Sequence, residues 1–239
     1  MRNKFTVLAT IALGMLAFST GAMGAEEVQG GSFMDLAKDG SFMEIIILLV
    51  SIAGFALALQ AMVSMRAHLL RPPELANELL NCVQEGNLDA AVEAAQSDGS
   101  MLGTVAFATL SNAQYGKEAM ESAMADTGEV EANKLLNKIG VLNLIAAIAP
   151  MLGLTGTTIG MIKTFAVIAV KADAVTASDM AKGIAVALIC TFLGLMVAIP
   201  LLCVGFFLKA KVTQIVLEIA NDCNEMIRVV TSGETTQEA

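Results

Sequence analysis

The sequence is poor in the side chains that most enzymes, metal sites and nucleic-acid readers use. It contains no tryptophan, one tyrosine and one histidine, His68. Its four cysteines form no C-x-x-C pair, so the spacing predicts neither a zinc site nor a disulfide framework. No nucleophile–base pair is evident. We therefore expect no catalytic residue, no metal site and no cofactor, and we predict that the chain is not an enzyme.

Charged residues are also scarce. They make up 15% of the 239 residues, where about 25% is usual for a soluble domain. Hydrophobic residues make up 56%, and the mean hydropathy is +0.69. This composition predicts a membrane protein in contact with a lipid bilayer. The net charge of −9 argues against a nucleic-acid partner.

The N-terminus has the features of an export signal. Arg2 and Lys4 precede a short apolar stretch, and small residues around Ala22 and Gly24 follow it. This order predicts a signal peptide over residues 1–24. An uncleaved signal anchor is the alternative. Residues 25–44 then form a polar periplasmic segment.

Three apolar runs are each long enough to cross a hydrocarbon core of about 30 Å. The predicted transmembrane helices are 45–65, 139–170 and 183–208. Between the first two, residues 66–138 carry many acids and apolar residues at helical spacing, which predicts a helical domain in water. A short turn, 171–182, separates the last two helices. Residues 209–239 form a C-terminal amphipathic helix and tail.

The positive charges near the span ends predict the orientation. Six lie on one side, at Arg66, Arg71, Lys134, Lys138, Lys209 and Lys211. The other side has three, or four when Lys163 is included. The larger set belongs in the cytoplasm, which agrees with an exported N-terminus. The predicted fold class is an all-α membrane protein with three transmembrane helices, a helical cytoplasmic domain and the N-terminus outside.

The second and third spans are rich in small and hydroxyl residues, unlike a plain lipid anchor. We predict that a set of these residues packs one helix against another: Pro150, Gly153, Gly156, Gly160, Ala187, Gly194, Ala198 and Pro200. Thr157 and Thr191 have two possible roles. They could bond backbone carbonyls and fill an interface, or line a narrow, weakly polar pore.

The three apolar runs contain no aspartate, glutamate or arginine. Proton pathways through membranes normally use ionisable side chains. Lys163, near the outer end of the second span, fits a side chain that extends its charge to the lipid headgroups. A proton pathway built from this chain therefore requires a protonatable group from another subunit.

Two sequence runs resemble a known family. APMLGLTGTTIGMIKTF, residues 149–165, is similar to the second-span motif of the MotA/TolQ/ExbB proton-channel family. GIAVALICTFLGLMVAIP, residues 183–200, resembles the third-span motif of its ExbB/TolQ branch. The order, separation and three-span topology match as well, so the resemblance covers most of the mature chain.

This resemblance implies a multi-pass protein of the inner (cytoplasmic) membrane that assembles as a homo-pentamer. A smaller single-span partner, ExbD or TolR, would supply an intramembrane aspartate inside the central pore. Thr157 and Thr191 match the pore-facing threonines of the family. The complex would couple the proton motive force to a TonB-like or TolA-like transducer and hence to outer-membrane transport or envelope work.

The sequence departs from the family in places. Val186 stands where some members have a glutamate before the threonine, Lys163 lies at a variable position, and a cleavable signal occurs in only part of the family. Two other functions remain open. One is a flagellar-type, MotA-like stator subunit, and the other is a membrane scaffold that does not conduct protons.

Overall fold

The computed structural model describes residues 42–171 and 176–237. The predicted signal peptide and most of the segment that follows it lie outside the described residues. Every regular element in the described part is helical, and no strand occurs there. The all-α prediction is therefore confirmed.

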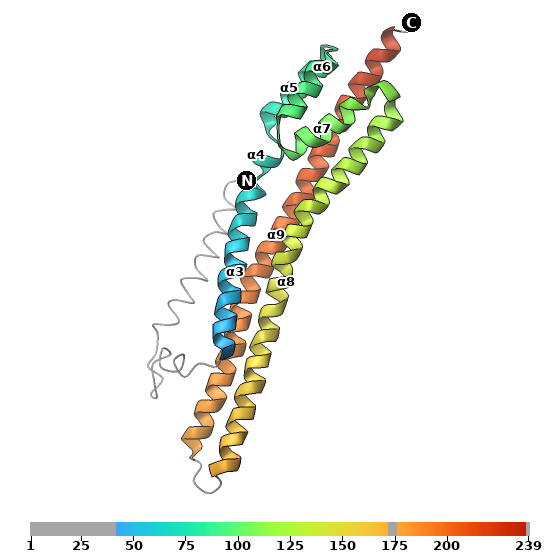
Figure 1. The fold of residues 1–239 in the computed structure, drawn as a ribbon. Helices are drawn as coiled ribbons and strands as arrows, with labels where there is room; N and C mark the ends of the chain where they lie inside the picture. The colour runs from blue at the N-terminus through green and yellow to red at the C-terminus, as the bar shows by residue number, and fades with distance from the viewer. Residues whose placement is uncertain (1–41, 172–175, 238–239) are drawn as a thin grey trace. The chain divides into compact units, whose positions relative to one another are not determined.

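Three long helices dominate the described chain (Figure 1). They are α3 (Phe42–Ser64), α8 (Lys117–Lys171) and α9 (Ala177–Gln237). Each contains a stretch long and apolar enough to cross a membrane, which confirms the three predicted spans. Pro150 and Pro200 lie inside α8 and α9 without ending them, as membrane helices tolerate.

The described residues form two compact units. Residues 42–58, 141–171 and 176–205, here called the apolar unit, comprise most of α3 and adjoining parts of α8 and α9. Residues 59–140 and 206–237, here called the polar unit, comprise the end of α3, the short helices and the remaining parts of α8 and α9.

The short helices of the polar unit are α4 (Ala67–Leu70), α5 (Pro73–Gln84), α6 (Leu88–Ser97) and α7 (Met101–Ser111), followed by the 3₁₀ turn η1 (Ala113–Tyr115). Local sequence explains their bounds. Pro73 is the first residue of α5, where its missing N–H costs no helical hydrogen bond. After α5, Gly86 has φ +76°, a conformation that glycine adopts without steric cost.

Side-chain caps start the next two helices. Asn87 Oδ1 accepts a hydrogen bond of 3.2 Å from the Ala90 N–H at the start of α6. Ser100 Oγ accepts one of 3.1 Å from the Gly103 N–H at the start of α7. Each cap satisfies an N–H that the helix itself leaves unpaired.

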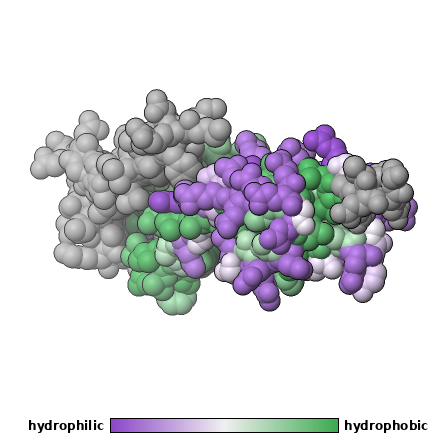
Figure 2. All heavy atoms as spheres, turned by 90° about the horizontal axis from the view of Figure 1, so that it is seen from above, coloured by the Kyte–Doolittle hydropathy of each residue, from purple (hydrophilic) through white to green (hydrophobic). Residues whose placement is uncertain are grey.

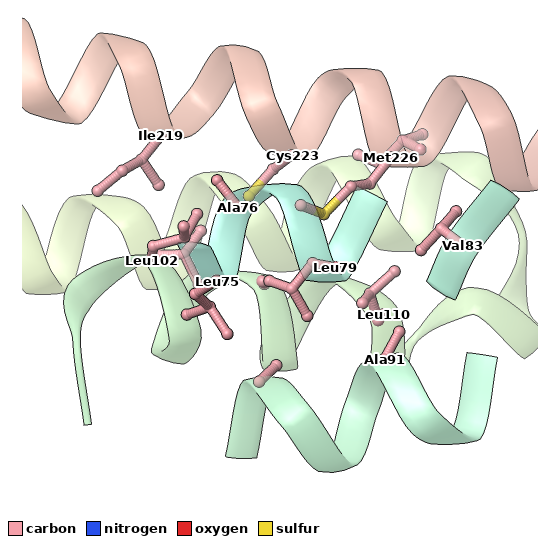
Figure 3. Close-up of a cluster of buried hydrophobic side chains, with 14 of the residues drawn as sticks. Leu75, Ala76, Leu79, Val83, Ala91, Leu102, Leu110, Ile219, Cys223 and Met226 are labelled. Atoms are coloured by element: carbon pink, nitrogen blue, oxygen red, sulfur yellow. The ribbon is translucent and has the colours of Figure 1, made fainter. Parts of the chain in front are cut away.

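Large apolar side chains fill the core of the polar unit (Figure 3). Leu79 of α5 and Leu102 of α7 are fully buried there, beside Met226 and Cys223 of α9. Amphipathic α5 supplies four buried residues, Leu75, Ala76, Leu79 and Val83. Their three-to-four-residue spacing places them on one helix face. Figure 2 shows hydrophilic residues gathered in patches beside hydrophobic ones on the face it presents.

An ion pair joins the N-terminal end of α5 to α9. The Arg71 guanidinium donates to both carboxylate oxygens of Asp222, over 2.6 Å from Nε and 2.9 Å from Nη2. Two parallel bonds fix the orientation of both groups. Hydrogen bonding to Asp222 raises the pKa of Arg71 above its usual value, so the guanidinium remains charged.

Candidate functional site

Glycine allows α8 and α9 to approach closely in the apolar unit. A Cβ added at Gly153 would lie 2.9 Å from the Cys190 carbonyl oxygen, and one at Gly194 would lie 2.7 Å from the Ala149 carbonyl oxygen. Real side chains essentially never come so close to backbone atoms. The backbones of the two helices are therefore in direct contact, as in other small-residue membrane interfaces.

The contact continues along both helices. A Cβ at Gly156 would lie 2.7 Å from the Cys190 Cβ, and one at Gly160 would lie 2.9 Å from the Ala187 Cβ. Ala187, Ala198 and Pro200 are buried, and Pro150 is half-buried. The eight residues predicted to pack helices therefore all lie in the apolar unit, and none of their side chains is fully exposed.

Thr191 lies at this contact, and Thr157 directly follows Gly156, which takes part in it. Thr191 Oγ1 of α9 donates to the Gly153 carbonyl oxygen of α8 over 3.4 Å, a long and weak hydrogen bond. Thr157 Oγ1 donates to the Leu154 carbonyl oxygen of its own helix over 2.7 Å. Both residues are half-buried. Each hydroxyl thus donates a hydrogen bond to a backbone carbonyl, and its oxygen keeps lone pairs that can accept another hydrogen bond.

The other hydroxyls of this part of α8 make local bonds only. Thr155 donates to the Met151 carbonyl, Thr158 to the Leu154 carbonyl and Thr164 to the Gly160 carbonyl, over 2.8–3.0 Å. This four-residue back-bonding is common for threonine in helices. Thr191 differs from these residues because its described bond crosses to the neighbouring helix.

Much of the remaining surface of the apolar unit is apolar and exposed. Large exposed side chains include Leu48, Leu49, Ile52, Leu144, Met151, Leu154, Ile162, Phe165, Leu188, Phe192 and Leu195. Such a surface suits lipid or neighbouring subunits. Lys163 is exposed among these residues on α8.

Sequence reasoning missed one residue near the threonines. The apolar run begins at Ile45, but α3 begins at Phe42, so Glu44 lies in its first turn. Cys190 Sγ donates a hydrogen bond to Glu44 Oε1 over 3.6 Å, and Met43 Cβ would lie 3.7 Å from a Cβ at Gly156. The available signal was the pair Phe42-Met43, which extends the apolar pattern past the acid.

The polar unit offers no comparable chemistry. Cys223 is fully buried in its core, and burial raises the pKa of its thiol to about 12, so the group is a protonated, inert thiol at neutral pH. Burial together with the nearby Arg66 charge lowers the pKa of Lys211. Within residues 42–171 and 176–237, no three His, Cys, Asp or Glu side chains are placed to hold a metal ion.

The sequence matches the MotA/TolQ/ExbB proton channel family over residues 92–221. The matched region contains both motif runs and the whole α8–α9 contact described above. The chain belongs to this family.

Members with curated names are similar over part or most of the chain. A biopolymer transport ExbB homolog of Methanothermobacter thermautotrophicus is 31% identical over 189 residues, covering 76% of this chain and 64% of its own. Biopolymer transport protein exbB1 of Vibrio cholerae is 32% identical over 91 residues, covering 38% of this chain and 40% of its own. The chain thus spans less than two thirds of the length of these relatives.

The fold is also that of a solved family structure. MotAB of C. jejuni matches with a TM-score of 0.59 and 17% sequence identity, over 95% of this chain and 90% of that one. At this identity the likeness shows the fold alone. The predicted family and the predicted all-α fold with three membrane-spanning helices are therefore confirmed, and the orientation of the N-terminus stays a prediction.

Proposed function

We propose that this family member is an ExbB/TolQ-like subunit of a proton-channel motor in the inner membrane. The α8–α9 contact supports this proposal most directly. Half-buried Thr191 bonds across this contact, half-buried Thr157 follows Gly156 within it, and the apolar runs of both helices carry no acid. Hydroxyl groups can accept and donate hydrogen bonds along a proton path, but they do not titrate near neutral pH.

The missing titratable group would come from a second subunit. A single-span ExbD-like or TolR-like partner would place an aspartate beside Thr157 and Thr191 in a pore formed by a pentamer of this chain. The free lone pairs of the threonine hydroxyls would then bond the protonated carboxyl. The narrow backbone contact through Gly153 and Gly194 would hold the two hydroxyls in register.

The available energy is adequate for mechanical work. One charge that crosses a potential of 100 mV releases about 2.3 kcal/mol. In the proposed orientation the N-terminus and the 171–182 turn face the periplasm, and the polar unit faces the cytoplasm. The released energy would reach a TonB-like or TolA-like transducer and drive outer-membrane transport or envelope work.

The threonines provide the test of this function. Thr157→Val and Thr191→Val replace each hydroxyl with a methyl group of nearly the same size. When each variant is reconstituted with its single-span partner in liposomes under a proton gradient, its proton flux should fall about tenfold or more, since a hydrogen bond to a charged or titrating group is worth roughly 1.5–3 kcal/mol. Assembly, measured by native mass, should be unchanged.

Thr155→Val is the matched control on the same helix. Thr155 also donates to a backbone carbonyl, over 2.8 Å, but its residue is exposed and its described hydrogen bond stays within α8. Full flux in this variant together with loss in the other two supports the pore. Full flux in all three variants rejects the assignment of Thr157 and Thr191.

A flagellar-type stator is the second candidate, because the fold matches MotAB. A stator would normally have a fourth span, which here requires that residues 5–22 are retained as a helix. N-terminal sequencing of the mature protein separates the two cases. A non-conducting scaffold predicts no proton flux from the wild-type complex with its partner.

A further inference from the structure

A carboxyl group lies where the two motif helices meet α3. Glu44 Oε1 accepts the Cys190 Sγ–H bond of 3.6 Å, and the preceding residue, Met43, lies beside Gly156. Cys190 and Gly156 are the immediate sequence neighbours of Thr191 and Thr157. Glu44 is therefore at the level of the threonine pair. Its side chain is half-buried.

The apolar surroundings continue past this level. From Gly156, α8 runs another 15 residues to Lys171, which is about 22 Å at 1.5 Å per residue. Exposed apolar side chains occur along that stretch, including Ile162, Phe165 and Val170. On α9, Leu188 lies two residues before Cys190 and is also exposed. A continuous apolar surface of this kind suits lipid or a neighbouring protein, and we take Glu44 to lie within it.

Among the side chains that the structure describes, none places a positive charge against Glu44. In the described part of the chain, Glu44 has no ion pair, and its hydrogen-bond donor is a thiol, which is a weak donor. On α8 the next cation is Lys163, seven residues or about 10 Å beyond Gly156, and its residue is exposed. On α9, Asp179 and Lys182 lie eleven and eight residues before Cys190. Lys38 and Asp39 precede Glu44 in the sequence, outside the described residues.

We propose that Glu44 is a proton-binding site of this subunit and is held as a neutral carboxyl within the apolar layer at the level of Thr157 and Thr191. An intramembrane acid without a partner charge is costly in its ionised form, and binding a proton removes that cost. The site belongs to this chain and is separate from any aspartate that a partner supplies. We infer this site from the membrane span of α3 and from the Glu44–Cys190 contact, and the inference does not require that the protein conducts protons.

The test is chemical modification with dicyclohexylcarbodiimide in membranes that contain the full chain. This apolar reagent reacts with protonated carboxyl groups. The carboxyl proton passes to one carbodiimide nitrogen, the carboxyl oxygen bonds the central carbon, and rearrangement gives a stable N-acylurea that carries the whole reagent. Peptide mass spectrometry then identifies the modified residue, and the Glu44→Gln variant confirms the assignment.

Glu118 is the matched control, because it is an exposed glutamate in the first turn of α8. A carboxyl group in water is mostly ionised at neutral pH and so reacts slowly with a carbodiimide. Glu44 should therefore be modified roughly tenfold or more above Glu118, and the difference should shrink as the pH is lowered to about 4. Equal modification of the two residues at about pH 7 would overturn the proposal.

A pair of substitutions gives an independent result. Glu44→Gln imitates the neutral carboxyl, so the amount of membrane-integrated subunit should equal that of wild type. Glu44→Asp keeps a carboxyl that can ionise. If the Gln variant accumulates several-fold less than wild type while the Asp variant does not, the ionised form is required and the proposal is wrong. Neither readout depends on proton flux, so a failure of the channel assignment leaves this test intact.

Discussion

The polar unit and the apolar unit are each packed internally by a different kind of side chain. In the polar unit, large residues such as Leu79, Leu102 and Met226 fill a core that the short helices share with α8 and α9. In the apolar unit, glycine and alanine leave room for the backbones of α8 and α9 themselves to touch. Water drives the first arrangement through the hydrophobic effect. Lipid gives no such drive, so the second depends on close van der Waals contact.

The difference predicts that removing atoms damages the polar unit most. Leu79→Ala empties a fully buried position and should lower the free energy of unfolding by about 2–5 kcal/mol. Protection of α5 amides from hydrogen exchange, measured in detergent micelles, reports this loss. Glu78→Ala, at an exposed position of the same helix, is the control and should have little effect. Comparable protection in both variants would contradict a tightly packed core.

Adding atoms should instead damage the apolar unit. Gly156→Ala introduces a Cβ only 2.7 Å from the Cys190 Cβ, so α8 and α9 must separate, at a cost of about 1–3 kcal/mol. Gly140→Ala adds the same atom to α8 where nothing lies within 4 Å, and should stabilise the helix by up to about 1 kcal/mol. Thermal unfolding midpoints of the two variants should shift in opposite directions. A rise in both would show that the glycine contact is loose.

The smallest expected effect concerns the ion pair of the polar unit. Arg71→Lys keeps the positive charge but cannot form two parallel bonds to Asp222. Both side chains are partly exposed, at 29% and 20%, so solvent screening limits the loss of stability to about 1 kcal/mol. Chemical denaturation of the Arg71→Lys and Asp222→Asn variants measures it. Additive losses in the double variant would show that the two residues do not interact.

The sequence was sufficient to predict elements whose cause is local. Continuous apolar runs predicted three spans, and Gly86 and Ser100 lie at the helix boundaries that their backbone and capping preferences favour. The two motif runs also predicted the family, which the match over residues 92–221 confirms.

Long-range contacts could not be predicted in this way. Arg71 and Asp222 are 151 residues apart, and nothing near either residue indicates the other. The position of Glu44 against Cys190 depends on how far α3 slides along α9, a register that apolar runs do not specify. The crossing of the Thr191 hydroxyl to Gly153 depends on the rotation of α9 in the same way. The pore role of both threonines remains a prediction.

The two internal prolines have a mechanical consequence. Proline has no N–H, so the carbonyl of the residue four positions earlier loses its helical donor, at Ala146 in α8 and at Met196 in α9. Each helix therefore lacks one backbone hydrogen bond at that level, which lowers the cost of bending there. If a load acts along α8 and α9, we expect them to bend at Pro150 and Pro200 more readily than elsewhere.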